Sequence, residues 1–442
     1  MTYNVLVLGT YAVDTPEGGG KYVLYHLFKR LPFQFNIKFL SLVESDKIRK
    51  ELLISPNFEN IQIPQDIEQA KIQWKEESKN KTGLFDVIQI NYWKHNSAYI
   101  ETVKKQLLNC NVIILEHPYL ANLIKSLNPH VPIIYHAHNL EFFQKEPILD
   151  SELLKDVKNV EQLACDLSNQ VWGSSEIECN AFSTIYRVSQ DKLKLLPHGA
   201  DLSTKLIERI IHEKTKSKIK ELKDTTTFVF VGSWHPPNLE ALEFIISDLA
   251  QINKNFLFFI IGSVKDFYLS KHPESDIPEN VILLGSITND EKYGIYELSD
   301  FAINPMFSGA GTNLKMIEYM AAGLPIISTE FGARGLKISN KTLICGNENF
   351  IDNIKNITSS NYYGSPSIKE NYDIIRNEYD YDKIAGKCTN LILELFNHEI
   401  SILNNIFYDV VEEMNKMTIL QHDNLVDEIS KEIESIVKPL DA

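Results

Sequence analysis

The stretch from Asn304 to Glu330 reads NPMFSGAGTNLKMIEYMAAGLPIISTE and is the most informative part of this 442-residue chain. It predicts a strand that ends at Pro305, a loop of small residues, a helix over Thr312–Ala322 and a second strand. Gly323 is suited to end that helix, because glycine readily adopts the left-handed backbone of a helix C-cap. The loop places backbone N–H groups at the amino end of the helix, where they can bind an anion.

Two charged residues of this helix indicate what the loop binds. Lys315 lies in the first turn, where its ammonium group adds positive charge to the anion site. Glu318 follows three residues later on the same face, and a carboxylate there can accept two hydroxyls, as from a ribose. An ordinary helix-surface ion pair between the two residues is the alternative reading. The chain lacks the Gly-Lys-Ser/Thr signature, so this loop is not a P-loop.

Short apolar runs alternate with amphipathic stretches over residues 1–200 and again over 227–375, which predicts two parallel sheets with helices on both faces. A Lys/Glu-rich connector spans 201–226. Residues 376–442 are predicted to be helical, with an acidic tail whose apolar stripes fall in 402–414 and 425–437.

The strands expected in the first domain are Asn4–Leu8, Ile37–Leu40, Val87–Ile90, Val112–Leu115 and Ile133–Tyr135. Those expected in the second are Thr227–Gly232, Phe256–Gly262, Val281–Gly285, Phe301–Pro305 and Ile326–Thr329.

Composition excludes several classes of protein. The chain carries 44 basic and 59 acidic residues, for a formal charge of −15, and this argues against general nucleic-acid binding, which needs many Lys and Arg against phosphate. No apolar run approaches the roughly 20 residues that span a bilayer. The five cysteines include no CxxC pair, so neither a zinc site nor a disulfide framework is expected. The expected location is therefore the cytoplasm, either free or at the inner face of the membrane.

Taken together, these features resemble family 4 glycosyltransferases, the retaining enzymes with the GT-B fold also called glycosyl transferases group 1. The helix at 312–322 resembles their donor-binding helix. Other motifs occur in the family's order: Gly18–Gly20 in the first loop, HAHNLE at His136–Glu141, LPHGAD at Leu196–Asp201 and FVGS at Phe230–Ser233. Two positions depart from the common pattern. Ala310 stands where many members have a first glutamate, and Ser233 stands where they have an arginine.

The resemblance implies an α/β protein of GT-B architecture, with two Rossmann-like parallel-sheet domains facing a cleft and a C-terminal helical extension. It implies His138 and Lys315 as catalytic residues and no metal site. The donor-binding residues that it implies are Gly19, Gly20, Ser233, Gly285, Ile287, Gly309, Ala310, Gly311, Thr312, Asn313, Lys315 and Glu318.

The expected activity is that of a retaining glycosyltransferase of the hexosyltransferase type, metal-independent and without a cofactor, with a nucleotide-sugar as donor substrate. The acceptor would be a glycan, a lipid-linked sugar or a protein. Two other functions stay open: a sugar-nucleotide epimerase of the same fold, and a non-catalytic partner subunit. Peripheral membrane association and a homo-oligomer through the C-terminal helices also stay open, while packing of those helices on the parent domain is the simpler reading.

Overall fold

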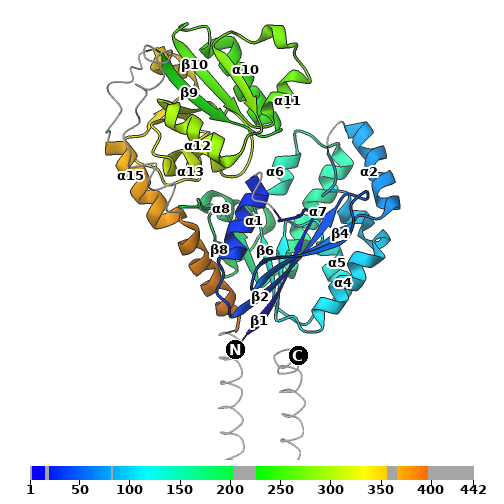
Figure 1. The fold of residues 1–442 in the computed structure, drawn as a ribbon. Helices are drawn as coiled ribbons and strands as arrows, with labels where there is room; N and C mark the ends of the chain where they lie inside the picture. The colour runs from blue at the N-terminus through cyan, green and yellow to red at the C-terminus, as the bar shows by residue number, and fades with distance from the viewer. Residues whose placement is uncertain (1, 15–18, 81–82, 203–224, 356–365, 397–442) are drawn as a thin grey trace, which may run out of the picture. The chain divides into compact units, whose positions relative to one another are not determined.

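A computed structural model describes residues 2–14, 19–80, 83–202, 225–355 and 366–396 of the chain. The Lys/Glu-rich stretch of the connector at 205–223 and the apolar stripes of the tail at 402–414 and 425–437 lie outside these residues. The chain divides into two compact units. Unit 1 contains Met1–Leu196 and the segment that begins at Ala385, and unit 2 is Pro197–Ile384. Each unit is a sheet covered by helices (Figure 1).

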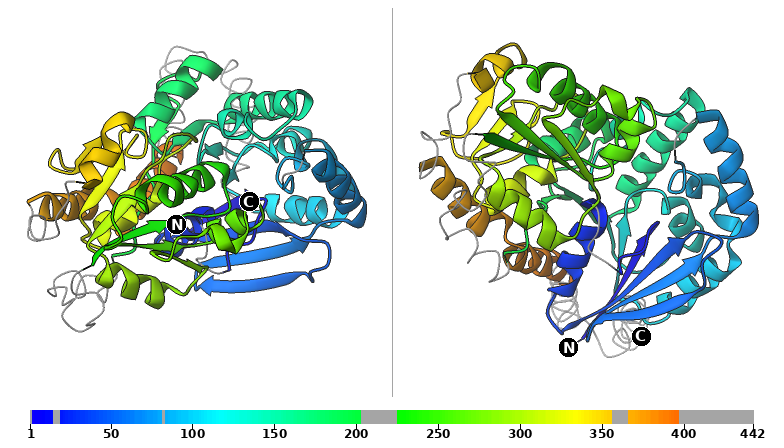
Figure 2. Two further views of the ribbon diagram at one scale, coloured as in Figure 1. Left: turned by 90° about the horizontal axis from the view of Figure 1, so that it is seen from above. Right: turned by 45° about the horizontal axis from the view of Figure 1, so that its top comes forward.

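Unit 1 has an eight-stranded sheet in the order β3-β4-β2-β1-β5-β6-β7-β8. All its strand pairs are parallel except β3–β4, which form an antiparallel hairpin at one edge. Strand order reverses between β1 and β5, where open α/β sheets usually bind ligands. The strands are β1 Tyr3–Gly9, β2 Phe35–Val43, β3 Lys50–Ser55, β4 Phe58–Pro64, β5 Val112–Glu116, β6 Ile133–His136, β7 Gln170–Gly173 and β8 Leu193–Leu195. Figure 2 shows the β3–β4 side of this sheet as long blue arrows.

The helices of unit 1 cover both faces of this sheet. One core joins alternate strand residues such as Leu6 and Leu40 to α4, α5, α7 and α8. The other face holds α1, whose Phe28 ring contacts Phe39 and Phe58. A helix at 381–396 also packs on this unit, since the Gln170 side chain donates to the Leu391 carbonyl. The helices are α1 Gly19–Lys29, α2 Ile67–Asn80, α3 Gln89–Tyr92, α4 Ser97–Leu107, α5 Ala121–Leu127, α6 Glu141–Lys145, α7 Ser151–Leu167 and α8 Glu176–Tyr186.

The strand predicted at Val87–Ile90 is wrong. This segment is a helical turn that leads into α3. Val87, Ile88 and Ile90 are buried all the same, and a short apolar run that is buried on all sides does not distinguish a strand from a helical turn. The sequence reading also missed the β3–β4 hairpin and the short strands β7 and β8. The other four strands predicted for this unit are confirmed.

Unit 2 has a six-stranded, fully parallel sheet in the order β11-β10-β9-β12-β13-β14. Alternate residues of β9 and β10 enter two separate cores, one against α10, α11 and α14 and the other against α12 and α13. The strands are β9 Thr226–Val231, β10 Phe256–Ile261, β11 Val281–Gly285, β12 Phe301–Asn304, β13 Ile326–Thr329 and β14 Leu343–Cys345. The helices are α10 Pro236–Phe244, α11 Val264–Leu269, α12 Asn289–Leu298, α13 Leu314–Ala321, α14 Phe350–Lys355 and α15 Pro366–Ile374.

The five strands predicted for the second domain and the helix after the glycine-containing loop are confirmed. That helix is α13, and Gly323 directly after it has φ +64°, the left-handed conformation of a helix C-cap. No helix in the described part of the chain combines the length and the apolar composition needed to cross a bilayer.

Candidate functional site

The candidate site residues fall into two groups, one in each unit, and both groups lie where parallel strands end. In unit 2 the segment Ser308–Thr312, called the glycine loop below, joins β12 to α13. In unit 1 the residues Glu116, His117, His136, His138 and Glu141, called the histidine cluster below, follow or end β5 and β6. Of this second group, His138 alone was predicted as a site residue. Ligands of open α/β sheets bind at this edge.

The backbone of the glycine loop has the shape that its sequence predicts. Gly309 has φ +114° and Gly311 has φ +70°, values that side-chain-bearing residues rarely adopt. A Cβ atom on Gly309 would also lie 3.2 Å from Cγ of Pro237, at the start of α10. The amides of Gly309, Ala310 and Gly311 donate no hydrogen bond to any described residue. The loop therefore offers consecutive N–H donors at the amino end of α13, which suits an anion.

Lys315 is held beside this loop without a carboxylate partner in the described residues. Its Nζ donates to Oδ1 of Asn238 at 2.7 Å and lies 3.6 Å from Sδ of Met306. It also lies 4.2 Å from the centroid of the Phe230 ring. Desolvation lowers the pKa of Lys315 to about 7, although the charge of Glu318 opposes this shift. A desolvated ammonium group in this position would be stabilised by a bound anion.

Glu318 is anchored from a different helix. Its Oε2 accepts from Nζ of Lys292 and from the hydroxyl of Tyr296, both at 3.1 Å, while Oε1 accepts no hydrogen bond within the described residues. The ion pair between Lys315 and Glu318 that the sequence left open is not formed, because Lys315 contacts Asn238 instead. Glu318 is thus a fixed carboxylate with one oxygen able to accept a ligand hydroxyl.

The remaining predicted donor residues of unit 2 lie at the same sheet edge or in its core. Ser233 is exposed after β9, and its hydroxyl contacts Nδ2 of Asn238. Gly285 ends β11 with φ +73°, and Ile287 packs against the core on the α12–α13 side. Asn313 donates from its side chain to the Gly332 carbonyl at 2.8 Å.

In unit 1, Gly19 and Gly20 open helix α1. A Cβ atom on Gly20 would lie 2.7 Å from the hydroxyl of Tyr11, so this position requires a residue without a side chain or a shift of Tyr11. The same hydroxyl lies 3.2 Å from Nε2 of His117. The predicted glycine pair is therefore connected through Tyr11 to the histidine cluster.

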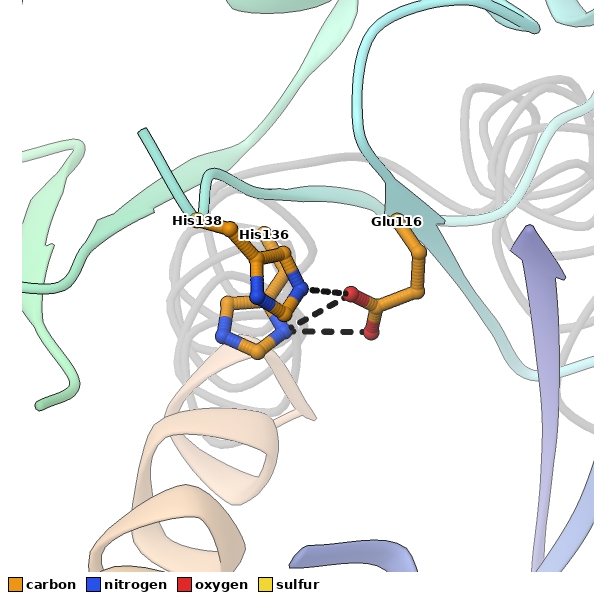
Figure 3. A group of neighbouring side chains, drawn as sticks. All are labelled: Glu116, His136 and His138. Atoms are coloured by element: carbon orange, nitrogen blue, oxygen red, sulfur yellow. Dashed lines mark hydrogen bonds and ion pairs between the residues drawn. The ribbon is translucent and has the colours of Figure 1, made fainter. Parts of the chain in front are cut away.

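A single buried carboxylate holds two histidines (Figure 3). Glu116 ends β5, and its carboxylate lies 3.0 Å from Nδ1 of His136 and 2.8 Å from Nε2 of His138. All three side chains are at most 5% exposed. Burial alone would raise the pKa of Glu116, but the charges of the two imidazoles and the hydrogen bonds from them lower it to about 2. Burial, and then the charge of His136, lower the pKa of His138 to about 4.

The Glu116 contact also fixes the tautomer of His138. At neutral pH the ring is uncharged, and Nε2 is the nitrogen that carries the proton if it donates to Glu116. Nδ1 is then the acceptor nitrogen of the ring. With a pKa of about 4, His138 cannot serve as a neutral-pH acid.

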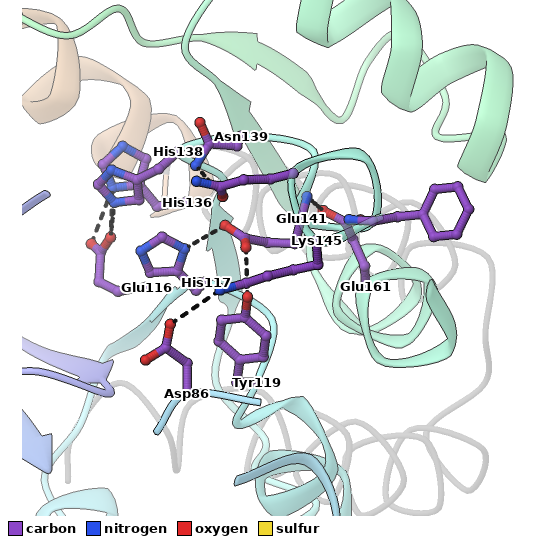
Figure 4. A network of polar contacts seen from close by, with 12 residues as sticks. Asp86, Glu116, His117, Tyr119, His136, His138, Asn139, Glu141, Lys145 and Glu161 are labelled. Atoms are coloured by element: carbon purple, nitrogen blue, oxygen red, sulfur yellow. Dashed lines mark hydrogen bonds and ion pairs between the residues drawn. The ribbon is translucent and has the colours of Figure 1, made fainter. Parts of the chain in front are cut away.

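A second contact between a histidine and a glutamate lies next to the first (Figure 4). Nδ1 of His117 lies 2.8 Å from Oε1 of Glu141, whose other oxygen accepts from the Tyr119 hydroxyl at 2.5 Å. Burial opposes protonation of His117, but Glu141 raises its pKa above the ordinary value. His117 also stacks on His138, with ring centroids 4.6 Å apart. The pKa values of the two stacked imidazoles are thus shifted in opposite directions.

His117 has φ +66°, whereas the two other non-glycine residues of positive φ in the described chain, Asn128 and Arg187, end helices α5 and α8. A left-handed histidine directly after a strand is strained, and such strain is typical of functional sites.

Glu161 of α7 stabilises the segment that carries Glu141, because its carboxylate accepts hydrogen bonds from the amides of Glu141 and Phe142. Burial raises the pKa of Glu161 to about 7.

Glu116, His136 and His138 are the one set in the described chain with the atom types and spacing of a cation site. Their contacts have ordinary hydrogen-bond lengths, and each is accounted for by an imidazole N–H facing the carboxylate. In this structure the three residues form a hydrogen-bonded group.

Solved structures of similar architecture cover most of the chain. Sucrose-phosphate synthase from Thermosynechococcus elongatus matches with a TM-score of 0.66 and 14% identity, over 90% of this chain and 100% of that one. Anabaena HepE in complex with UDP matches with a TM-score of 0.64 and 12% identity, over 89% and 100%. A structure described as trehalose-6-phosphate from E. coli bound with UDP-2-fluoro glucose matches with a TM-score of 0.63 and 14% identity, over 88% of this chain and 98% of that one.

This chain has the GT-B fold. The sequence matches cover shorter parts of the chain. Residues 225–359 match the family model described as Glycosyl transferases group 1. A Klebsiella pneumoniae protein described as an uncharacterized 44.6 kDa protein in the cps region is 28% identical over 163 residues. That match covers 33% of this chain and 42% of the relative.

Sequence reasoning singled out His138 in the amino-terminal GT-B unit but missed the groups that hold it. Glu116, His117 and Tyr11 were not selected, and Glu141 appeared only as part of a motif. The available signal was positional: Glu116 and His117 directly follow the apolar run Val112–Leu115, and polar residues at the carboxyl end of a parallel strand lie at the ligand-binding edge.

Replacement of Glu116 by glutamine tests the hydrogen-bonded assignment. Glu116→Gln keeps the size but removes the charge that both imidazoles face, so we expect it to destabilise unit 1 by about 1.5–3 kcal/mol. Urea denaturation followed by tryptophan fluorescence measures the change. The matched control is Glu101→Gln on α4, which breaks an exposed pair with Lys104 and should change stability by no more than about 0.5 kcal/mol. Equal effects of the two variants would contradict the assignment.

Proposed function

We propose that this chain is a glycosyltransferase that moves a sugar from a nucleotide-sugar donor to an acceptor hydroxyl with retention of anomeric configuration. The observation that carries the proposal is the arrangement at the carboxyl edge of the unit 2 sheet. The amides of Gly309–Gly311, which donate to no described residue, and the desolvated Lys315 suit a diphosphate, and the anchored Glu318 suits a ribose hydroxyl. The family-model match to glycosyl transferases group 1 spans these same residues.

The proposed role of the loop follows from the chemistry of glycosyl transfer. Breaking the bond between the anomeric carbon and the donor phosphate builds negative charge on the departing diphosphate. Fixed amide dipoles and an ammonium group stabilise that charge as it develops. In the retaining mechanism that we propose, the acceptor attacks from the face that the diphosphate leaves, and a phosphate oxygen takes the acceptor proton. His138 of unit 1 is proposed as a further residue of this reaction.

A nucleotide-sugar panel tests the proposal. The protein would be incubated with UDP-, GDP-, ADP- and dTDP-linked hexoses, because two of the structural relatives were solved with UDP or a UDP-sugar. Thermal shift measures binding, since a ligand specific for the folded state raises its stability, and released nucleotide measures turnover. Nucleotide release with a glycosylated product supports transfer. A donor epimer would support the epimerase, and a protein that binds no donor would support the non-catalytic partner.

Metal independence is part of the proposal and has a separate test. Because Lys315 and the loop amides are assigned to the phosphate charge, we expect treatment with EDTA to leave turnover unchanged. A parallel sample to which Mg²⁺ is restored serves as the control. Complete loss of turnover in EDTA with recovery in Mg²⁺ would contradict the assignment of the phosphate charge to these groups.

A further inference from the structure

Two histidines and one glutamate of unit 1 point the atoms that ligate metal ions toward one another. The register of β5 and β6 places Glu116 directly beside His136, and His138 follows two residues later, so its side chain leaves the chain on the same side. Figure 3 shows both rings facing the Glu116 carboxylate. One ligand atom of each residue lies within 4.8 Å of the other two. The strand register therefore builds a convergent set of two nitrogens and one oxygen.

The separations within this set are close to those of a zinc site. Bonds of about 2.0–2.2 Å from zinc to nitrogen and oxygen, at tetrahedral angles, separate neighbouring ligand atoms by about 3.3–3.5 Å. The Glu116 carboxylate lies 3.0 Å from Nδ1 of His136 and 2.8 Å from Nε2 of His138. An ion therefore requires these contacts to open by roughly half an ångström, and each ring nitrogen gives up the proton that faces Glu116.

Neighbouring rings hold the two imidazoles in this orientation. His117 stacks on His138 with ring centroids 4.6 Å apart, and Trp172 of β7 packs edge-on against His136 with centroids 5.6 Å apart. The three ligand side chains are at most 5% exposed. Entry of an ion therefore requires these walls to open, and binding should be slower than diffusion.

The charge and the donor types of this set favour a divalent transition-metal ion. Within the described residues Glu116 pairs with these two imidazoles and with no lysine or arginine, so no fixed cation competes for its oxygens. Two imidazoles and one carboxylate are the three protein ligands in one class of zinc peptidases. Mg²⁺ and Ca²⁺ prefer oxygen ligands alone. The set therefore suits Zn²⁺ and its analogue Co²⁺ better than Mg²⁺.

We propose that Glu116, His136 and His138 form a binding site for Zn²⁺ or a chemically similar transition-metal ion, and that its occupation inhibits sugar transfer. The site follows from its donor atoms and goes beyond the proposed function. The inhibition rests on that function, because His138 is proposed as a residue of the reaction, and a bound ion would fix its ring and add positive charge beside it. The ion is not needed for transfer, so turnover is still expected to survive EDTA.

Co²⁺ is the direct probe, because its visible absorption reports the geometry of its ligands. The full chain, freed of metal with EDTA and dialysed, would be titrated with Co²⁺, with Zn²⁺ and, as a negative control, with Mg²⁺. The titrations would compare the wild type with His136→Asn and His138→Gln, whose side-chain amides can donate to Glu116 from about the positions of Nδ1 and Nε2 but have no ring nitrogen. The matched control is His272→Gln, because Nε2 of His272 lies 2.9 Å from Glu243 in a pair that has no third ligand among the described residues.

We expect Co²⁺ and Zn²⁺ to bind the wild type and Mg²⁺ not to bind. Both cluster variants should weaken Co²⁺ binding by at least roughly 100-fold, and His272→Gln should match the wild type. Melting temperatures measured in parallel show whether the variants are folded. Electron paramagnetic resonance of the Cu²⁺-loaded wild type needs no variant, and it should show hyperfine coupling to two imidazole nitrogens.

Turnover measures the inhibition separately. Saturating Zn²⁺ should remove most of the wild-type turnover, whereas His136→Asn should keep the turnover that it shows without zinc. A wild type that binds neither Co²⁺ nor Zn²⁺, equal binding by the wild type and both folded variants, or Cu²⁺ spectra without imidazole coupling would overturn the site and leave the proposed function standing. Wild-type turnover that Zn²⁺ does not change would overturn the inhibition. Co²⁺ binding that depends on both histidines in a protein without sugar transfer would uphold the site and contradict the proposed function.

Discussion

Glu318→Ala should weaken nucleotide-sugar binding by roughly 10- to 160-fold, which corresponds to the loss of one hydrogen bond to a charged group. The physical reason is that Lys292 and Tyr296 hold one oxygen of this carboxylate and leave the other to accept a ligand hydroxyl. Glu318→Gln should have a smaller effect, because an amide oxygen still accepts but carries no charge. Isothermal titration with the best donor of the panel measures both variants.

The control for this prediction is Glu370→Ala, which removes a carboxylate of the same unit that contacts Lys341 and Ser339. Its donor affinity should equal that of the wild type. Because Glu318→Ala also leaves the half-buried Lys292 without this partner, the melting temperature of each variant must be measured in parallel. A well-folded Glu318→Ala protein with unchanged donor affinity would remove Glu318 from the site.

Donor affinity should fall as pH rises above about 7, by up to roughly tenfold per pH unit. The free protein has Lys315 with a pKa of about 7, and a bound diphosphate would raise that value. Binding therefore takes up a proton at alkaline pH. The contribution of Lys315 to the binding free energy is fully present below the pKa that Lys315 has in the free protein, and it declines above that pKa. Titrations between about pH 6.5 and 8.5 avoid the second ionisation of phosphate, which lies near 6 and is in any case blocked in a nucleotide-sugar.

Two variants of Lys315 make this prediction specific. Lys315→Arg should retain binding and lose the pH dependence over this range, because guanidinium remains charged. Lys315→Ala should bind the donor weakly at every pH, and its affinity should not change with pH. Proton uptake can be measured independently by repeating the calorimetry in buffers of different ionisation enthalpy. A wild-type affinity that does not change across the range would show that Lys315 does not contact the anion.

The fold could be predicted where the sequence pattern is long and repeated. Alternation of apolar runs with amphipathic stretches identified two parallel α/β units, and Asn304–Glu330 defined a strand, a loop, a helix and a strand in the order observed. The prediction was wrong where local pattern and tertiary environment conflict. Val87–Ile90 has the composition of a strand but lies in a helical turn, and the β3–β4 hairpin has too weak an alternation to be recognised.

The sequence by itself determined the chemistry available to this protein: a glycine loop before a helix, with Lys315 and Glu318 on that helix and His138 after a strand. Only the tertiary structure decided which groups act together. Parallel strands bring Glu116 and His138 within 2.8 Å across 22 residues of sequence, and they bring His136 within 3.0 Å of the same carboxylate. Burial then sets the charge states, since desolvation lowers the pKa of Lys315 to about 7. Residue spacing along a chain does not encode such contacts or solvation, because both depend on segments that only the folded sheet brings together.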